Sequence, residues 1–117
     1  MADIVIAEDT DLQRALVRGL IEPKHTVVGS ASDGAEAVEL VREHDPDVAV
    51  LDVNMPRIDG LEASERILAE RPAIGVVLST AVVSETVRSD AEAIGVDAFL
   101  VKPYTKRELL DAIDRSG

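Results

Sequence analysis

The stretch VAVLDVNMPRIDG, residues 48–60, runs a buried strand directly into a carboxylate. Its first four residues are apolar, which is typical of a strand covered on both faces of a parallel sheet. Asp52 follows them at once, and the turn-forming pair Met55 and Pro56 comes soon after. Because the charge stands at the end of the apolar run, this pattern predicts a carboxylate placed at the edge of a sheet.

The rest of the chain repeats the pattern of a short apolar run followed by a longer amphipathic stretch. The apolar runs, which predict strands, cover residues 4–7, 26–30, 48–51, 74–79 and 98–101. Helical periodicity follows Thr10 or Asp11 through Leu20, and four further helices are predicted over residues 32–44, 59–71, 84–95 and 105–117. This alternation predicts a parallel α/β sheet with helices on both faces, and the weak run at 26–30 is expected at a sheet edge.

Local signals set the ends of the last two predicted helices. Ser84 is expected to cap the fourth helix, and Gly95 is expected to end it. Thr105 is followed three residues later by Glu108, which predicts a capping box at the start of the fifth helix.

Composition limits the classes of protein to which the chain can belong. Its 117 residues predict one domain, and the absence of cysteine excludes disulfides and thiolate chemistry. The net charge of −11 argues against direct binding of nucleic acid, which needs clustered lysine and arginine. No apolar stretch approaches the roughly 20 residues that span a bilayer. The first residues also lack the features of a secretory signal, so a cytoplasmic protein is expected.

Five polar residues follow the predicted strands: Glu8 and Asp9, then Asp52, Thr80 and Lys102. In open α/β sheets, ligands bind at the carboxyl ends of the strands, so these side chains are expected on one rim. Each residue also has a simpler interpretation. The acid pair could cap the first helix, Asp52 could form a turn, Thr80 could be a loop hydroxyl, and Lys102 could reach solvent. Their joint arrival at one edge favours a functional site.

The chemistry of this set suits a divalent cation and a phosphoryl group. Mg²⁺ prefers oxygen ligands, and clustered carboxylates repel one another unless a cation neutralises them. A carboxylate such as Asp52 can accept a phosphoryl group as an acyl phosphate. Lys102 and Mg²⁺ would then neutralise the phosphoryl oxygens, and Thr80 would donate a hydrogen bond to one of them.

Four motifs together resemble the receiver domain of two-component response regulators. They are IAEDT, LDVNMPRIDG, LSTA and GVDAFLVKPYT, and the resemblance covers essentially the whole chain. It implies a flavodoxin-like, doubly wound sheet of five parallel strands in the order 2-1-3-4-5, with five helices. It also implies a single receiver domain over residues 1–117, with no output domain in this chain.

The resemblance implies a role for each residue of the predicted rim. Asp52 would be the phosphoacceptor, and Lys102 would hold the phosphoryl group. Mg²⁺ would bind Asp9 and Asp52 directly, Glu8 through a water or at longer reach, and the backbone carbonyl of Asn54. The pair is Glu-Asp where Asp-Asp is the usual pattern, which leaves the part played by Glu8 open.

The resemblance further implies a conformational switch formed by Thr80 and Phe99. Thr80 would move toward the phosphoryl group, and Phe99 stands at the aromatic switch position three residues before Lys102. Because phenylalanine has no hydroxyl, any coupling between the two would work through packing. The bond between Lys102 and Pro103 is expected to be cis.

The same resemblance implies the partners. A sensor histidine kinase or a histidine phosphotransfer protein would supply the phosphoryl group, with Leu12, Arg14, Ala15 and Arg18 as candidates for recognition. The face formed by residues 84–95, Phe99, Tyr104 and the last helix would control a downstream protein or a fused output domain, and it could support a homodimer. No membrane contact and no independent substrate turnover are expected, only catalysis of the protein's own aspartyl phosphorylation and dephosphorylation.

Three other classes of protein share some of these features. A haloacid-dehalogenase-like phosphohydrolase would need a second aspartate where Asn54 stands, and a nucleotide-binding domain would need a glycine-rich loop after the first strand. A pseudo-receiver, which signals without phosphorylation, would be expected to lack one of the acids, the threonine or the lysine. All of these are present, but the sequence leaves this third alternative open.

Overall fold

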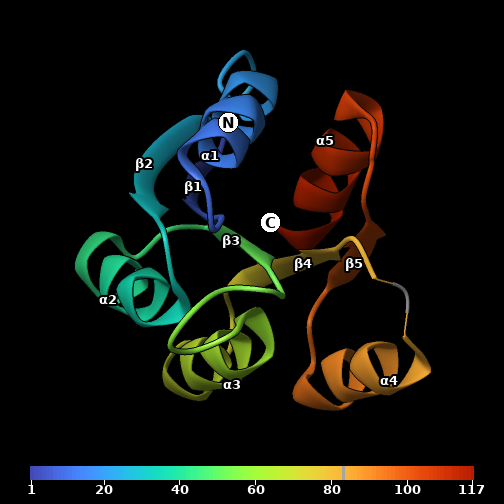
Figure 1. Ribbon diagram of the computed structural model, residues 1–117. Coiled ribbons are helices and arrows are strands. Elements are labelled where there is room, and N and C mark those ends of the chain that lie inside the picture. The colour runs from blue at the N-terminus through green and yellow to red at the C-terminus, as the bar shows by residue number, and fades with distance from the viewer. Residues whose placement is uncertain (83) are drawn as a thin grey trace.

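A computed structural model describes residues 1–82 and 84–117, and its centre is a five-stranded parallel sheet (Figure 1). The strand order is β2-β1-β3-β4-β5, as the resemblance implied. β-branched and other apolar residues fill the central strands, which suits a sheet covered on both faces. The strands are β1 (Asp3–Ala7), β2 (Thr26–Ala31), β3 (Val48–Asp52), β4 (Gly75–Thr80) and β5 (Ala98–Val101).

Five helices cover the two faces of the sheet. They are α1 (Asp11–Ile21), α2 (Gly34–His44), α3 (Gly60–Glu70), α4 (Glu85–Ile94) and α5 (Lys106–Ser116). Figure 1 shows α1 and α5 on one face and α2, α3 and α4 on the other. The expected caps are confirmed, since Ser84 caps α4, Gly95 ends it at a φ of 98°, and Thr105 and Glu108 form the capping box of α5.

The apolar core lies in two layers, one on each face of the sheet. Alternate residues of the strands point to opposite faces, so Val5 and Leu51 pack toward α2 and α3, whereas Ile6 and Val50 pack toward α1 and α5. β3 and β4 are buried along their whole lengths. β2, expected at an edge, lies at one, and several of its residues are only half-buried.

The strand boundaries differ from the predicted ones in a way that matters for the site. β3 includes Asp52, and β4 extends to Thr80, so both residues belong to the sheet itself. Their positions are therefore fixed by ladder hydrogen bonds rather than by loops. Among the helices of residues 1–82 and 84–117, none has the length and apolar composition needed to cross a membrane.

Candidate functional site

The acid pair lies just beyond the end of β1. The backbone N–H of Glu8 donates to the carbonyl of Ala31 at 3.1 Å, which continues the pairing of β1 with β2 by one residue. This places the Glu8 side chain in the interior, where Glu8 is 1% exposed, while Asp9 is exposed. The side chain of Thr10 caps α1 by accepting from the N–H of Gln13 at 3.1 Å. The interpretation of the acid pair as helix caps is therefore wrong.

Asp52 ends β3 and is 8% exposed. Its Oδ1 accepts from the backbone N–H of Asn54 at 3.2 Å, and its Oδ2 accepts from Lys102 Nζ at 3.2 Å. Asp52 thus shapes the turn and also faces the site, so its two interpretations are compatible. Gly60 closes the loop by donating to the carbonyl of Val53 at 2.8 Å. A Cβ at Gly60 would lie 2.3 Å from the carbonyl oxygen of Asp52, so only glycine permits this approach.

Lys102 joins three separate parts of the chain at the edge of the sheet. Its Nζ donates to Glu8 Oε2 at 2.9 Å, to Gln13 Oε1 at 2.8 Å and to Asp52 Oδ2 at 3.2 Å. These three acceptors match the three N–H donors of an ammonium group. The backbone N–H of Lys102 also donates to the carbonyl of Thr80 at 2.8 Å, and the bond to Pro103 is cis, as expected.

Gln13 belongs to the site, although the sequence did not predict it. Thr10 starts α1 at the rim, so the first turn of that helix carries Gln13 toward Lys102. The sequence signal that could have indicated Gln13 was its position as a polar residue in the first turn of the predicted helix, among the apolar residues Leu12 and Leu16. Gln13 also lines a cavity of about 350 Å³ together with Leu16, Lys102 and Tyr104.

Burial and charge perturb the pKa values of Glu8 and Tyr104. Burial raises the pKa of Glu8 from 4.5 to about 7, the ammonium of Lys102 opposes this rise, and the nearby charge of Asp52 adds to it. Glu8 Oε1 is buried and has no hydrogen-bond partner among the described residues. Burial also raises the pKa of the Tyr104 hydroxyl, and the negative charges of Glu8 and Asp52 raise it further. Both shifts favour the neutral forms of these groups, so the surroundings of Asp52 disfavour further negative charge.

Thr80 is 2% exposed at the end of β4, and its hydroxyl is held by the loop that follows. Thr80 Oγ1 accepts from the N–H of Val82 and donates to the carbonyl of Val82, each at 3.2 Å. Within the described residues, these are the hydrogen bonds of that hydroxyl. The strand thus brings Thr80 to the rim, but its hydroxyl is not directed at Asp52.

Phe99 lies on β5 and packs, half-buried, against the core layer on the side of α4. The guanidinium carbon of Arg88, on α4, lies 5.1 Å from the centre of the Phe99 ring. A cation at this distance over an aromatic face is attracted to it. The predicted switch residue is therefore in contact with α4, which belongs to the same predicted output face.

The oxygen atoms of the rim suit a hard cation. Glu8 and Asp52 present carboxylates, Glu8 Oε1 has no hydrogen-bond partner within residues 1–82 and 84–117, and Asn54 follows in the adjacent loop. Carboxylate and carbonyl oxygens are the ligands that Mg²⁺ prefers. However, nowhere in residues 1–82 and 84–117 do three His, Cys, Asp or Glu side chains gather into a group that could hold a metal. A metal here would depend on Glu8, Asp9, Asp52, the Asn54 carbonyl and water together.

Comparison with known proteins assigns the family. Residues 4–114 match the model of the response regulator receiver domain. The chain is 31% identical to the chemotaxis protein CheY of Halobacterium salinarum over 110 residues, which cover 94% of this chain and 92% of that protein. The chain belongs to the receiver domain family of two-component response regulators.

Two further relatives show where receiver domains of this kind occur. The chain is 43% identical to the transcriptional regulatory protein PdtaR of Mycobacterium tuberculosis, covering 95% of this chain but only 54% of that protein. The fold matches a DNA-binding response regulator of the LuxR family from Staphylococcus aureus with a TM-score of 0.93 at 27% identity, covering 99% of this chain and 98% of that chain. Related sequences thus occur both as nearly whole proteins and as parts of longer ones.

Proposed function

We propose that this chain accepts a phosphoryl group on Asp52 and uses the resulting change to control a partner. One observation carries the proposal: Lys102 Nζ bridges Asp52 and Glu8 at the edge of the sheet, although these partners lie 50 and 94 residues away in sequence. An arrangement that gathers such distant residues around one carboxylate supports a site for charged chemistry. The receiver family generally binds Mg²⁺, which agrees with the oxygen-rich rim.

The proposed reaction is an in-line transfer to the Asp52 carboxylate. A carboxylate oxygen of Asp52 forms a bond to phosphorus, while the bond from phosphorus to the donor breaks and the donor leaves with the electron pair. Lys102 keeps its ammonium beside Asp52 Oδ2 and pairs with the arriving phosphoryl oxygens. Thr80 must leave Val82 before its hydroxyl can donate to the same group.

The proposed metal site uses Asp9, Asp52 and the carbonyl of Asn54, with Glu8 at longer reach. Bound Mg²⁺ would supply positive charge that shields Asp52 from the incoming phosphoryl group. Glu8 is the least exposed of these acids, and its pKa of about 7 leaves part of it protonated near neutral pH in the metal-free protein. A divalent cation would favour its ionised form.

The proposed output face consists of α4, β5 and the start of α5. Phosphorylation adds roughly −1.5 to −2 charge, which would draw Thr80 and Lys102 toward Asp52. Thr80 is hydrogen-bonded to Val82, two residues before the cap of α4, so its displacement would change the chain that enters α4. Phe99 contacts Arg88 of α4, so β5 and α4 would respond together. A downstream protein, a fused output domain or a second copy of the chain would bind that face.

The proposed donor is a sensor histidine kinase or a histidine phosphotransfer protein in the cytoplasm, and residues 1–117 act as one receiver domain. The part of this proposal that concerns a single domain is supported by the chain's match to 92% of CheY of Halobacterium salinarum. Direct contact with nucleic acid or membrane is not part of the proposed role.

The test is the intact mass of the protein after incubation with Mg²⁺ and acetyl phosphate, with Asp52→Asn in parallel. One added phosphoryl group on the wild type, none on the variant and none with EDTA would support the proposal. If the wild type binds Mg²⁺ and beryllofluoride but shows no adduct, the acyl phosphate is lost faster than the assay. Absence of both the adduct and beryllofluoride binding would contradict the proposal and favour the pseudo-receiver.

A further inference from the structure

The loop after Asp52, residues 53–59, is held against the beginning of α2. The backbone N–H of Gly34, the first residue of α2, donates to the carbonyl of Ile58 at 3.0 Å. A Cβ at Gly34 would lie 2.1 Å from the Ile58 oxygen, which no side chain permits. The helix and the loop therefore touch through their backbones, and glycine makes this approach possible.

A charged pair reinforces this contact. Arg57 Nε lies 3.2 Å from Asp33 Oδ2, and the second guanidinium nitrogen donates to Asp33 Oδ1 at 3.2 Å. Arg57 has a left-handed φ of 65°, a conformation that costs a residue with a side chain free energy. The Asp33 side chain is only 16% exposed, and its Oδ1 also caps α2 by accepting from the N–H of Glu36 at 2.8 Å. One carboxylate thus fixes both the helix terminus and the middle of the loop.

The part of the loop next to Asp52 is anchored to the sheet and the core. The N–H of Val53 donates to the carbonyl of Ser79 at 2.8 Å, Asn54 donates to Asp52 Oδ1, and the Met55 side chain is buried in the core layer. Beyond Met55, the contacts with α2 through Arg57 and Ile58 hold the second half of the loop in place. If the loop adopted many conformations, Mg²⁺ binding would have to order it, and the free energy needed for this would lower the affinity for Mg²⁺.

We infer that Asp33 and Arg57 are positioning residues for the metal site, because they hold the loop that presents the carbonyl of Asn54. This inference rests on the proposed function, since it assumes that Mg²⁺ binds at the rim. Neither residue touches the metal in this role. They act through the loop, in the way that outer partners orient the ligands of other metal sites.

Two variants remove the ion pair between Arg57 and Asp33 and preserve the local backbone preferences of the loop and of α2. Arg57→Ala keeps a Cβ and so keeps the backbone restriction of residue 57. Asp33→Ser keeps a good N-cap for α2 while losing the carboxylate that pairs with Arg57. The effect of each on Mg²⁺ binding is therefore separable from any effect on folding.

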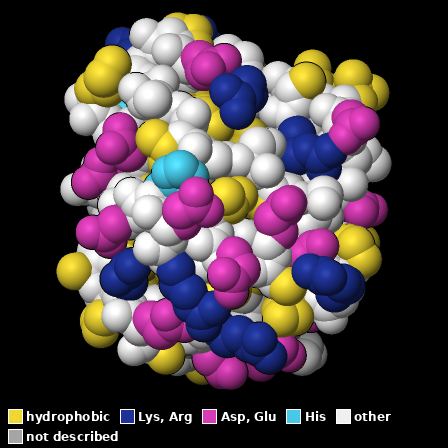
Figure 2. Space-filling view, turned by 90° about the vertical axis from the view of Figure 1, so that its left-hand side faces the viewer, with side chains coloured by type: hydrophobic (Ala, Val, Ile, Leu, Met, Phe, Trp, Pro, Cys, Tyr) yellow, Lys and Arg dark blue, Asp and Glu magenta, His cyan; other side chains and the backbone are white. Residues whose placement is uncertain are grey.

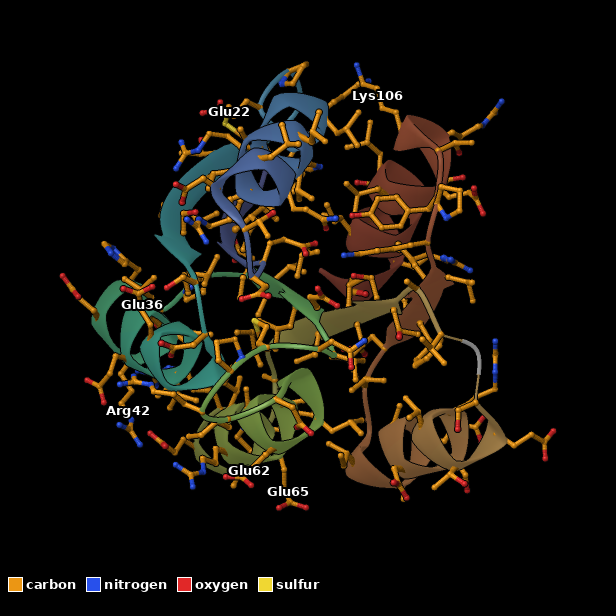
Figure 3. The ribbon with its side chains drawn as sticks, in the orientation of Figure 1. Glu22, Glu36, Arg42, Glu62, Glu65 and Lys106 are labelled. Carbon is orange, nitrogen blue, oxygen red and sulfur yellow. The ribbon has the colours of Figure 1, made fainter. Side chains whose placement is uncertain are left out.

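The chain offers a matched control in a second two-point pair. Arg42 of α2 donates to Glu70 of α3 at 2.8 and 2.6 Å, and the two side chains are 47% and 41% exposed. Figure 3 shows Arg42 on the side of α2 that faces away from the sheet. Figure 2 shows acidic and basic side chains interleaved over the face of the molecule where β2 and α2 lie. Arg42 also donates to Glu39 at 2.7 Å, so Arg42→Ala removes at least as many arginine contacts as Arg57→Ala, away from the rim.

The measurement is the dissociation constant of Mg²⁺, followed by amide chemical shifts, with the melting temperature of each metal-free variant. We expect Arg57→Ala and Asp33→Ser each to weaken Mg²⁺ binding about fivefold. This change corresponds to nearly the whole interaction free energy of an exposed ion pair with two contacts. The double variant should bind no more weakly than either single variant, because one interaction is removed. Arg42→Ala should bind Mg²⁺ as the wild type does. In metal-free protein, the Gly34 amide should exchange faster in Arg57→Ala than in the wild type.

Unchanged Mg²⁺ affinity in both Arg57→Ala and Asp33→Ser would overturn the inference, and so would an equal loss in Arg42→Ala. Phosphorylation of the wild type with acetyl phosphate separates this result from a failure of the proposed function. A wild type that is phosphorylated, with variants that bind Mg²⁺ normally, contradicts the inference alone. A wild type that neither binds Mg²⁺ nor accepts a phosphoryl group overturns both.

Discussion

Glu8 is the residue whose environment differs most from that of an ordinary glutamate. It is 1% exposed, one of its oxygens has no partner among the described residues, and burial raises its pKa from 4.5 to about 7. A carboxyl group with a raised pKa binds its proton more tightly in the folded state than in the unfolded state. The free energy of unfolding should therefore fall as the pH rises from about 4.5 to about 7, if no metal is present.

Glu8→Gln should remove this dependence, because the amide has no proton to lose in that range. Relative to wild type, the variant should gain stability with rising pH, by at most about 1.4 kcal/mol per pH unit. Urea unfolding at pH 5, 6, 7 and 8 in EDTA measures the difference. Glu65→Gln is the control, since Glu65 lies on α3 and its exposed side chain points outward from that helix (Figure 3). Parallel stability curves for Glu8→Gln and wild type would contradict the prediction.

At the scale of elements, α4 buries fewer of its described residues in the core than any other helix. Ala91 is its one buried residue among those described, whereas α5 buries Leu109, Ala112 and Ile113. Its contact with β5 includes the Arg88 guanidinium over the Phe99 ring. A helix with so few buried contacts can shift at low cost, which suits the proposed output face.

The contact between Arg88 and Phe99 can be measured with a double-mutant cycle. Arg88→Met and Phe99→Leu should each lower the free energy of unfolding, and their coupling should be about 0.5–1 kcal/mol, as for an exposed cation over an aromatic ring. Denaturant unfolding of the wild type, both single variants and the double variant gives this value. Additive effects within the error of the experiment would show that the contact contributes nothing to stability.

The sequence predicted most of the elements and the rim, and it did so for physical reasons. Apolar runs and helical periodicity depend on burial alone, so they are visible in the chain, and the topology rule then brings strand ends together. The order of the strands came from the resemblance. Prediction failed where a side-chain contact depends on the direction of a helix or rotamer. Examples are Gln13 reaching Lys102, Thr80 turning to Val82, and Arg57 pairing with Asp33.

Arg14 illustrates the same limit. The sequence offered it as a surface residue for recognition of a partner. In the structure its guanidinium donates to the carbonyls of Glu8 at 2.8 Å and Asp9 at 3.5 Å, and pairs with Asp11. Helical periodicity placed Arg14 on α1 correctly, but it could not show that a long side chain folds back over the rim.

For the whole molecule, stability depends on two core layers that share one sheet. Leu109 of α5 is fully buried in the layer beneath α1 and α5, whereas Leu16 of α1 is 60% exposed. Leu109→Ala should lower the free energy of unfolding by about 2–5 kcal/mol, because it leaves a cavity in the core. Leu16→Ala should change it by less than about 0.5 kcal/mol. Urea unfolding measures both, and similar losses would show that α5 is not held as the structure indicates.

The long sequence separation of the residues around Lys102 has a consequence for synthesis on the ribosome. Glu8 and Asp52 are made well before Lys102, which follows Asp52 by 50 residues. At the usual 5–20 residues per second, Lys102 is made roughly 3–10 s after Asp52 and roughly 5–19 s after Glu8. Until β5 arrives, β4 also has an unpaired edge. A nascent chain therefore completes the charged site and the sheet in the same late step, when β5 pairs with β4.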